Sequence, residues 1–135
     1  MFTDSHCHLT FPELRSALPE IRAAMERAQV NRAMCICTTL EEFPDVLQLA
    51  TDYDNFWASV GVHPDNEGVS EPNVELLLEL GASPRVLAIG ETGLDYYRLG
   101  TRSVAGVAAR PLSRAHSFGT PIAQAAGNPY TQRFC

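Results

Sequence analysis

Apolar and polar positions follow a repeating order along residues 1–97, in which short apolar runs alternate with longer amphipathic stretches. The apolar runs predict four β-strands, over residues 3–6, 33–38, 56–61 and 86–91. Between them, apolar residues recur at helical spacing, as in the stripe from Ile21 to Ala28. Strands that alternate with helices through short connections are typical of parallel sheets with right-handed crossovers. The pattern therefore predicts an α/β fold, either a (β/α) barrel or a doubly wound sheet.

Local signals predict where the helices begin. The segments Thr10–Glu13 and Thr39–Glu42 both have the Thr-x-x-Glu pattern of a capping box, and the second is expected to open a helix that runs to about Tyr53. Pro19 interrupts or restarts the first helix, because proline cannot donate the hydrogen bond that a helix interior requires.

Polar residues follow the predicted strands at the edge where parallel α/β folds carry their chemistry. His6 and His8 close the first strand. His63 follows the third strand, and Glu91 ends the fourth. Asp4, His6 and His8 are spaced two apart, so strand geometry places them on one face. Two imidazoles on one face can chelate a divalent metal, so the pattern predicts a metal site.

Each of these residues also has a simpler interpretation. The two histidines can be ordinary residues of a polar strand end, His63 can be a turn residue before Pro64, and Glu91 can cap the next helix. A carboxylate directly after a buried run is costly without a partner, which favours the metal. A carboxylate can also bridge two metal ions. In phosphoester hydrolysis, two-metal sites stabilise both the attacking oxygen and the leaving oxygen.

Charge divides the chain at about Tyr97. All 16 acidic residues lie in residues 1–97, whereas residues 98–135 contain five Arg and no Asp or Glu. The net charge of −6 argues against non-specific nucleic-acid binding through a basic surface. The second segment also lacks a clear apolar period, so we expect residues 98–135 to be poorly ordered.

The four cysteines and the apolar runs indicate the compartment. Cys35 and Cys37 lie in an apolar run, where buried free thiols are common, and the cysteine spacing fits no zinc-finger pattern. A disulfide framework is therefore not expected. No run is long enough to span a bilayer, and no signal peptide is recognisable. We expect a cytoplasmic protein that does not contact membranes.

Three motifs together resemble the TatD family of metal-dependent hydrolases. They are Asp4–Leu9 (DSHCHL), Gly61–Pro64 (GVHP) and Gly90–Tyr97 (GETGLDYY), in the order and spacing of that family. The family belongs to the amidohydrolase superfamily of TIM barrels, and its characterised members are deoxyribonucleases, including 3′–5′ exonucleases. The resemblance implies that this chain holds the N-terminal half of a (β/α)8 barrel, which takes about 250 residues when complete.

The resemblance also implies roles for individual residues. His6 and His8 would ligate one metal ion, Glu91 would bridge two ions, and His63 would contact the substrate phosphate. The expected cofactors are divalent cations, two in an intact site, with magnesium first and zinc or manganese as alternatives. The expected partner is DNA, hydrolysed at its phosphodiester bonds by metal-activated water.

Residues 98–135 depart from the family pattern and are expected to be an unrelated or frameshifted tail after a TatD-like domain over residues 1–97. The chain is accordingly interpreted as a truncated form of such an enzyme. Two alternatives remain open. The chain can be an inactive half-barrel that binds only metal or a partner, with self-association through exposed strand edges. It can also be another amidohydrolase-superfamily hydrolase.

Overall fold

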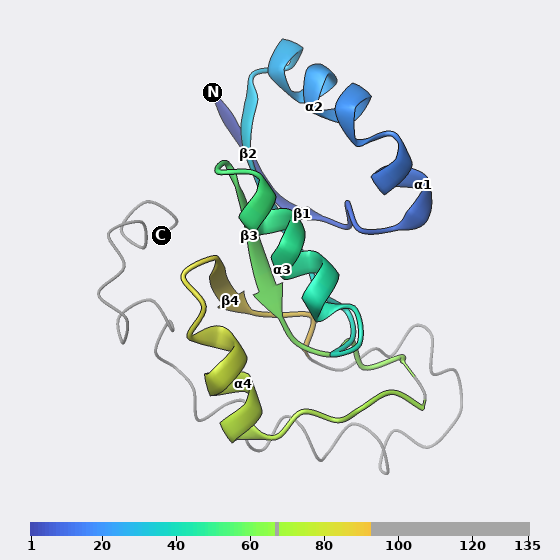
Figure 1. Cartoon of the computed structure of the whole chain (residues 1–135), viewed down its shortest axis with the longest axis vertical. Helices are drawn as coiled ribbons and strands as arrows, with labels where there is room; N and C mark the ends of the chain where they lie inside the picture. Colours follow the sequence, from blue (N-terminus) through green and yellow to red (C-terminus); the bar gives the residue numbers. More distant parts are fainter. Residues whose placement is uncertain (67, 93–135) are drawn as a thin grey trace.

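The computed structural model describes residues 1–66 and 68–92 (Figure 1). The predicted tail over residues 98–135 and the predicted boundary at residue 97 lie outside the described residues. In chain order the elements are β1 (Phe2–Cys7), α1 (Pro12–Ser16), α2 (Leu18–Arg27), β2 (Val30–Cys35), α3 (Phe43–Asp52), β3 (Phe56–Val60), α4 (Val74–Gly81) and β4 (Val86–Ile89). None of the described helices is long and apolar enough to cross a membrane.

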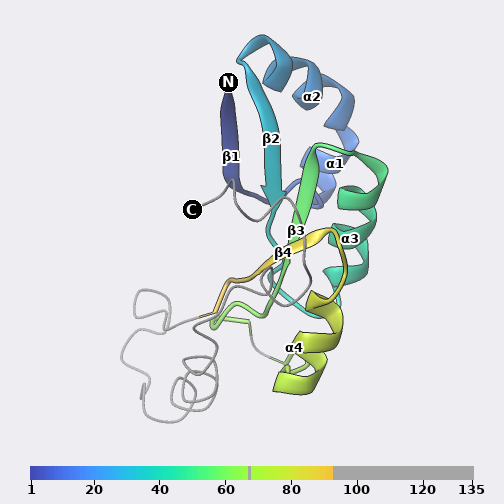
Figure 2. The ribbon, with the colours of Figure 1, turned by 90° about the vertical axis from the view of Figure 1, so that its left-hand side faces the viewer.

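The four strands form one parallel sheet in the order β1-β2-β3-β4. The helices lie on the same side of this sheet, as the edge-on view in Figure 2 shows. This arrangement confirms the predicted α/β class with adjacent parallel strands. It also places the C-terminal ends of all four strands at one edge, where the candidate residues are expected.

The core lies between the sheet and its helices. Every residue of β3 is buried, and α3 contributes the apolar side chains that pack against it. The fully or nearly fully buried members of this layer include Ala33, Cys35, Phe56, Ala58, Val60, Val46, Leu49 and Ala50. Burial of a side chain of this size typically contributes about 1.5–3 kcal/mol, so this layer holds the sheet and helices together.

The second strand differs from its predicted bounds. It was expected over residues 33–38, but it runs from Val30 to Cys35 because Val30 pairs with Phe2 at the start of β1. Beyond Cys35, the Ile36 N–H donates to the Cys7 carbonyl (2.8 Å) and the Cys37 N–H donates to Ser59 Oγ (3.1 Å). The chain stays buried there while it leaves the ladder, so the apolar run marks burial rather than strand length.

The predicted capping boxes are only partly present. Helix α1 begins after Phe11 without a side-chain cap, so the expected role of Thr10 is wrong; its hydroxyl donates to the Glu42 carboxylate instead. Thr39 Oγ does accept the Glu42 N–H (3.1 Å) before α3. Helix α4 is capped by Asn73, whose side chain accepts from the Leu76 N–H (2.7 Å).

Replacing Gln29 with glycine should stabilise the fold. Gln29 follows α2 in the left-handed region (φ 59°), which is costly for any residue with a Cβ. We expect Gln29→Gly to raise the free energy of unfolding by about 0.5–1 kcal/mol, measured by urea denaturation. The matched control, Ala23→Gly on the exposed side of the same helix, should lower it by about 1 kcal/mol. Equal destabilisation by both changes would contradict this account.

Candidate metal centre

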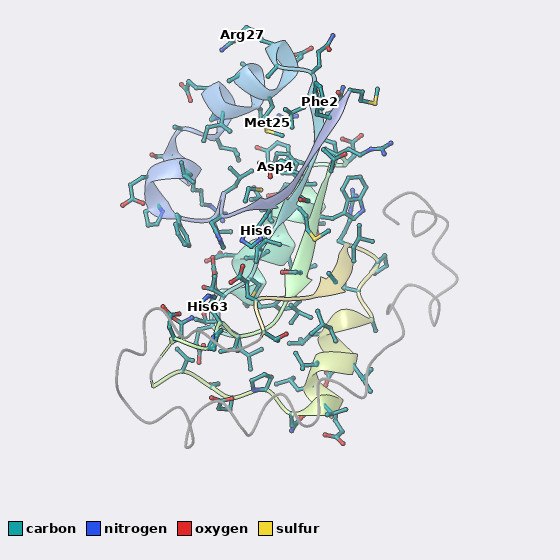
Figure 3. The ribbon with its side chains drawn as sticks, turned by 180° about the vertical axis from the view of Figure 1, so that it is seen from behind. Phe2, Asp4, His6, Met25, Arg27 and His63 are labelled. Atoms are coloured by element: carbon teal, nitrogen blue, oxygen red, sulfur yellow. The ribbon has the colours of Figure 1, made fainter. Side chains whose placement is uncertain are left out.

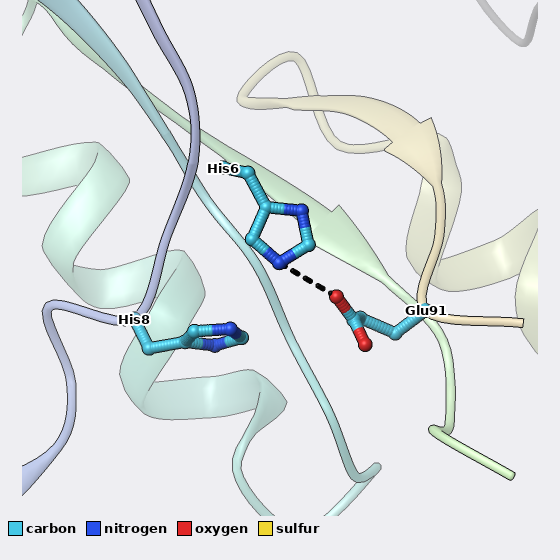
Figure 4. Close-up of side chains that lie close together, drawn as sticks. All are labelled: His6, His8 and Glu91. Carbon is cyan, nitrogen blue, oxygen red and sulfur yellow. Dashed lines mark ion pairs between the residues drawn. The ribbon is translucent and has the colours of Figure 1, made fainter. Parts of the chain in front are cut away.

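Three side chains from the two outer strands and the segments that follow them meet at the C-terminal edge of the sheet. One ligand atom from each of His6, His8 and Glu91 lies within 4.8 Å of the others (Figure 4). His6 belongs to β1 and Glu91 follows β4, which are at opposite sides of the sheet. Side chains stand roughly perpendicular to a flat sheet, and three strand spacings are about 14 Å. The contact therefore requires the sheet to curl, as a barrel sheet does.

The Glu91 carboxylate lies between two imidazoles. Its Oε1 is 2.8 Å from His6 Nε2, and its Oε2 is 3.4 Å from His63 Nε2. The Glu91 side chain is only 11% exposed, whereas that of His6 is 58% exposed. A buried carboxylate is expensive without such partners, so the two imidazoles help to hold it in place.

His8 has an unsatisfied nitrogen that fits a metal ligand. Its Nδ1 is buried and has no hydrogen-bond partner among residues 1–66 and 68–92. The ring stacks on Phe11 with centroids 5.0 Å apart, and the His6 ring meets it edge-on at 5.1 Å. A buried polar atom without a partner typically costs about 1–3 kcal/mol. Two imidazoles and a carboxylate are a donor set that suits a divalent metal, so these residues fit the expected ion.

The position of Glu91 depends on an unusual backbone. Its φ of 59° lies in the left-handed region, which non-glycine residues adopt mainly at turns and functional sites. The preceding Gly90 donates its N–H to the Val60 carbonyl (3.0 Å). A Cβ on Gly61 would lie 1.7 Å from the Gly90 oxygen, so only glycine permits this approach of the two chain segments.

His63 lies beside the three clustered residues rather than among them. Its backbone N–H donates to the Thr38 carbonyl (2.8 Å), and its Nδ1 contacts the Asp65 carboxylate. Figure 3 shows His63 and His6 away from the end of the molecule that carries Phe2 and Arg27. Asp65 was missed by the sequence analysis, although a carboxylate two residues after a candidate histidine is a visible signal.

Asp4 does not join the cluster, although strand alternation predicted that it would share a face with the histidines. The pairing of β1 with β2 shifts between Asp4 and Cys7. The Asp4 carboxylate accepts a hydrogen bond from the backbone N–H of His6 (3.0 Å) instead.

Cys7 stands between the two histidines in sequence but belongs to a different environment. It packs against the core, and its thiol contacts the Met34 carbonyl (3.3 Å). A hydrogen bond with the Cys35 thiol, together with burial, raises the pKa of Cys7 above its ordinary value. Burial likewise raises the pKa of Cys37 to about 11. Both residues therefore remain protonated thiols, which are poor metal ligands.

The cluster of His6, His8 and Glu91 agrees with the family to which the sequence matches. Residues 3–122 match the model of the family described as TatD related DNase. This chain belongs to the TatD family. The match confirms the resemblance carried by the three motifs, and it extends past residue 97.

Among curated TatD-family proteins, this chain is 38% identical over 98 residues to the uncharacterized metal-dependent hydrolase YcfH of Escherichia coli K12. It is 34% identical over 96 residues to the 3′-5′ ssDNA/RNA exonuclease TatD of the same strain. Each alignment covers 70% of this chain, but only 36% of YcfH and 37% of TatD. The chain therefore spans little more than a third of the length of these relatives.

A solved TatD-family structure has a similar fold. The crystal structure of YJJV, a TatD homologue from Escherichia coli K12, aligns with a TM-score of 0.54 and 30% identity. The alignment covers 71% of this chain and 38% of YJJV. The four parallel strands and their helices thus correspond to part of a TatD-type barrel.

Adding one methyl group at Gly61 should disrupt the site and the fold. We expect Gly61→Ala to lower the free energy of unfolding by about 3 kcal/mol, because its Cβ would overlap the Gly90 carbonyl. Gly90→Ala is the matched control, since its Cβ would make ordinary contacts with Ser59 at 3.6–3.7 Å. Thermal and urea unfolding measure both variants, and a Gly61→Ala protein as stable as Gly90→Ala would refute the close approach.

Proposed function

We propose that His6, His8 and Glu91 bind a divalent metal ion as part of the hydrolytic centre of a TatD-type deoxyribonuclease. The observation that carries the proposal is the convergence of three ligand atoms within 4.8 Å, with the buried Nδ1 of His8 lacking a hydrogen-bond partner in the part of the chain that the structure describes. The metal-dependent hydrolases among the relatives support it. When bound, the ion lowers the pKa of a coordinated water and stabilises negative charge on a phosphate oxygen.

The donor set bears on the identity of the metal. The resemblance favours magnesium, which prefers oxygen ligands, whereas two imidazoles suit zinc and other transition ions. We expect affinity for the isolated site to follow Zn²⁺ over Mn²⁺ over Mg²⁺. Which ion supports turnover in a cell depends also on its availability. Glu91 presents two carboxylate oxygens, so it is the residue that would bridge to a second ion.

His63 is placed to contact the substrate. The His63 Nδ1 contacts both the Asp65 carboxylate and the Asp65 backbone N–H, and these contacts restrain the orientation of the ring. The other nitrogen, Nε2, faces the Glu91 carboxylate at 3.4 Å. A phosphate group held at the metal would meet this side of the imidazole, so we assign His63 to phosphate binding.

The proposed substrate is single-stranded DNA. It rests on the family and on the relative named as a 3′-5′ ssDNA/RNA exonuclease. The metal and His63 would provide charge complementarity to the phosphate. Hydrolysis of another ester or an amide remains the second candidate of the same superfamily.

An inactive metal-binding chain is supported by one specific observation. The described residues bring together a single group of three donors, whereas a two-metal clamp needs more. In the described part of the chain, β1 and β4 are also paired on one side only, and such edges can pair with another copy. Self-association through these edges belongs to this alternative.

Metal binding by the purified chain tests the proposal directly. Isothermal titration with Mn²⁺ should show one binding event, and His6→Ala, His8→Ala or Glu91→Gln should each weaken it by at least about tenfold. His116→Ala is the matched control because it removes an imidazole that the proposal does not use. If the three variants bind Mn²⁺ as the unmodified chain does, the assignment of these ligands is wrong.

Nuclease activity separates the enzyme from the inactive alternative. We expect the 135-residue chain to release negligible nucleotide from a single-stranded oligonucleotide with Mg²⁺ or Mn²⁺, because its described residues bring together only three donors and a two-ion centre needs more. The full-length Escherichia coli TatD exonuclease is the positive control. Metal-dependent release by the short chain that disappears in Glu91→Gln would overturn this expectation and assign the activity to the described site.

A further inference from the structure

The carboxylate of Glu42 joins two segments that are far apart in the sequence. It lies on the connection between β2 and α3, next to the first turn of α3. Its Oε1 accepts a hydrogen bond from Thr10 Oγ1 at 2.5 Å. Its Oε2 accepts from the Thr38 backbone N–H (3.1 Å) and from Thr38 Oγ1 (2.9 Å). Within the described residues Glu42 forms no ion pair, so three neutral donors hold it.

One arm of this network leads to His8. Thr10 is two residues beyond His8, in the turn closed by the Phe11 N–H donating to the His8 carbonyl (3.1 Å). The His8 ring also stacks on Phe11. Because Glu42 holds the hydroxyl of Thr10 in this turn, it restrains the backbone that carries His8.

The other arm leads to His63. The carbonyl of Thr38 accepts the backbone N–H of His63 (2.8 Å) and the side-chain amide of Asn66 (2.9 Å). The Thr38 N–H and hydroxyl are held by Glu42 at the same time. The segment after β3 positions His63 against Glu91. Its backbone is hydrogen-bonded to Thr38, whose orientation is set by Glu42.

We propose that Glu42 is a positioning residue that sets the placement of His8 and His63 without touching metal or substrate. The inference rests on the proposed metal centre and adds a residue to it. Groups that hydrogen-bond metal ligands directly typically contribute about 10–100-fold to metal affinity, and Glu42 acts one residue further out, through Thr10 and Thr38. The β2–α3 connection supplies none of the three clustered donors among the described residues, yet it ties together the loops on either side of it.

Charge and positioning can be separated by substitution. Glu42→Gln removes the negative charge but keeps an acceptor for Thr38 and a polar partner for Thr10. Glu42→Ala removes both, while the Glu42 backbone N–H keeps its bond to Thr39 Oγ1 at the start of α3. Glu41→Ala removes the same charge one residue away, where the carboxylate instead accepts the Ser70 N–H (3.0 Å).

Titration of the 135-residue chain with Mn²⁺ distinguishes these variants. We expect Glu42→Ala to weaken binding by about tenfold, and Glu42→Gln and Glu41→Ala to stay within about threefold of the unmodified chain. If Glu42→Gln binds Mn²⁺ as weakly as Glu42→Ala does, the loss of affinity is due to the charge, and the positioning role is overturned. A folded Glu42→Ala protein that binds normally would also overturn it.

A second readout needs neither metal nor Glu42→Ala. Amide hydrogen exchange in metal-free protein reports the two arms separately, through the Phe11 and His63 N–H groups. Thr10→Val should speed exchange at the Phe11 N–H while leaving the His63 N–H protected, and Thr10→Ser should restore slow exchange at Phe11. Unchanged exchange at Phe11 in Thr10→Val overturns the inference, even if the unmodified chain binds no metal. Absence of Mn²⁺ binding with the exchange pattern intact overturns the proposed function alone.

Discussion

The candidate site depends on the close approach of the chain after β3 to the chain after β4. Gly61 lies so near the Gly90 carbonyl that any side chain there would collide with it. This contact leads the chain into Glu91, whose left-handed backbone (φ 59°) accompanies a side chain directed at His6 of the opposite outer strand. The position of the Glu91 carboxylate therefore depends on the curl of the sheet, because a flat sheet could not bring Glu91 and His6 together.

Each loop at the C-terminal edge of the sheet supplies different residues of the candidate site. The strand β1 and the turn after it supply His6 and His8, and the segment after β4 supplies Glu91. The loop after β3 supplies His63 with its Asp65 partner. The β2–α3 connection supplies Glu42, which touches its neighbours only through hydrogen bonds. A largely buried carboxylate beside three imidazoles fits the donor set of a cation site, and the metal hypothesis therefore accounts for more of the geometry than a polar strand end does.

Sequence patterns predicted the elements that depend on local chemistry. Apolar runs and their spacing identified the four parallel strands, and the rule that parallel sheets carry chemistry at one edge grouped His6, His8 and Glu91. The same patterns missed features that depend on distant partners. Thr10 was assigned to a local cap but bonds Glu42, 32 residues away. The bounds of β2 follow from its pairing with β1, which no period along one strand reveals.

The central claim is that His6, His8 and Glu91 share one metal ion, and a crystal grown with Mn²⁺ would test it most directly. Anomalous scattering locates manganese independently of any assumption about its ligands. The account predicts one peak within about 2–2.5 Å of a nitrogen from each histidine and of a Glu91 oxygen. A peak bound elsewhere, with the His6–Glu91 contact at 2.8 Å unchanged, would contradict the claim.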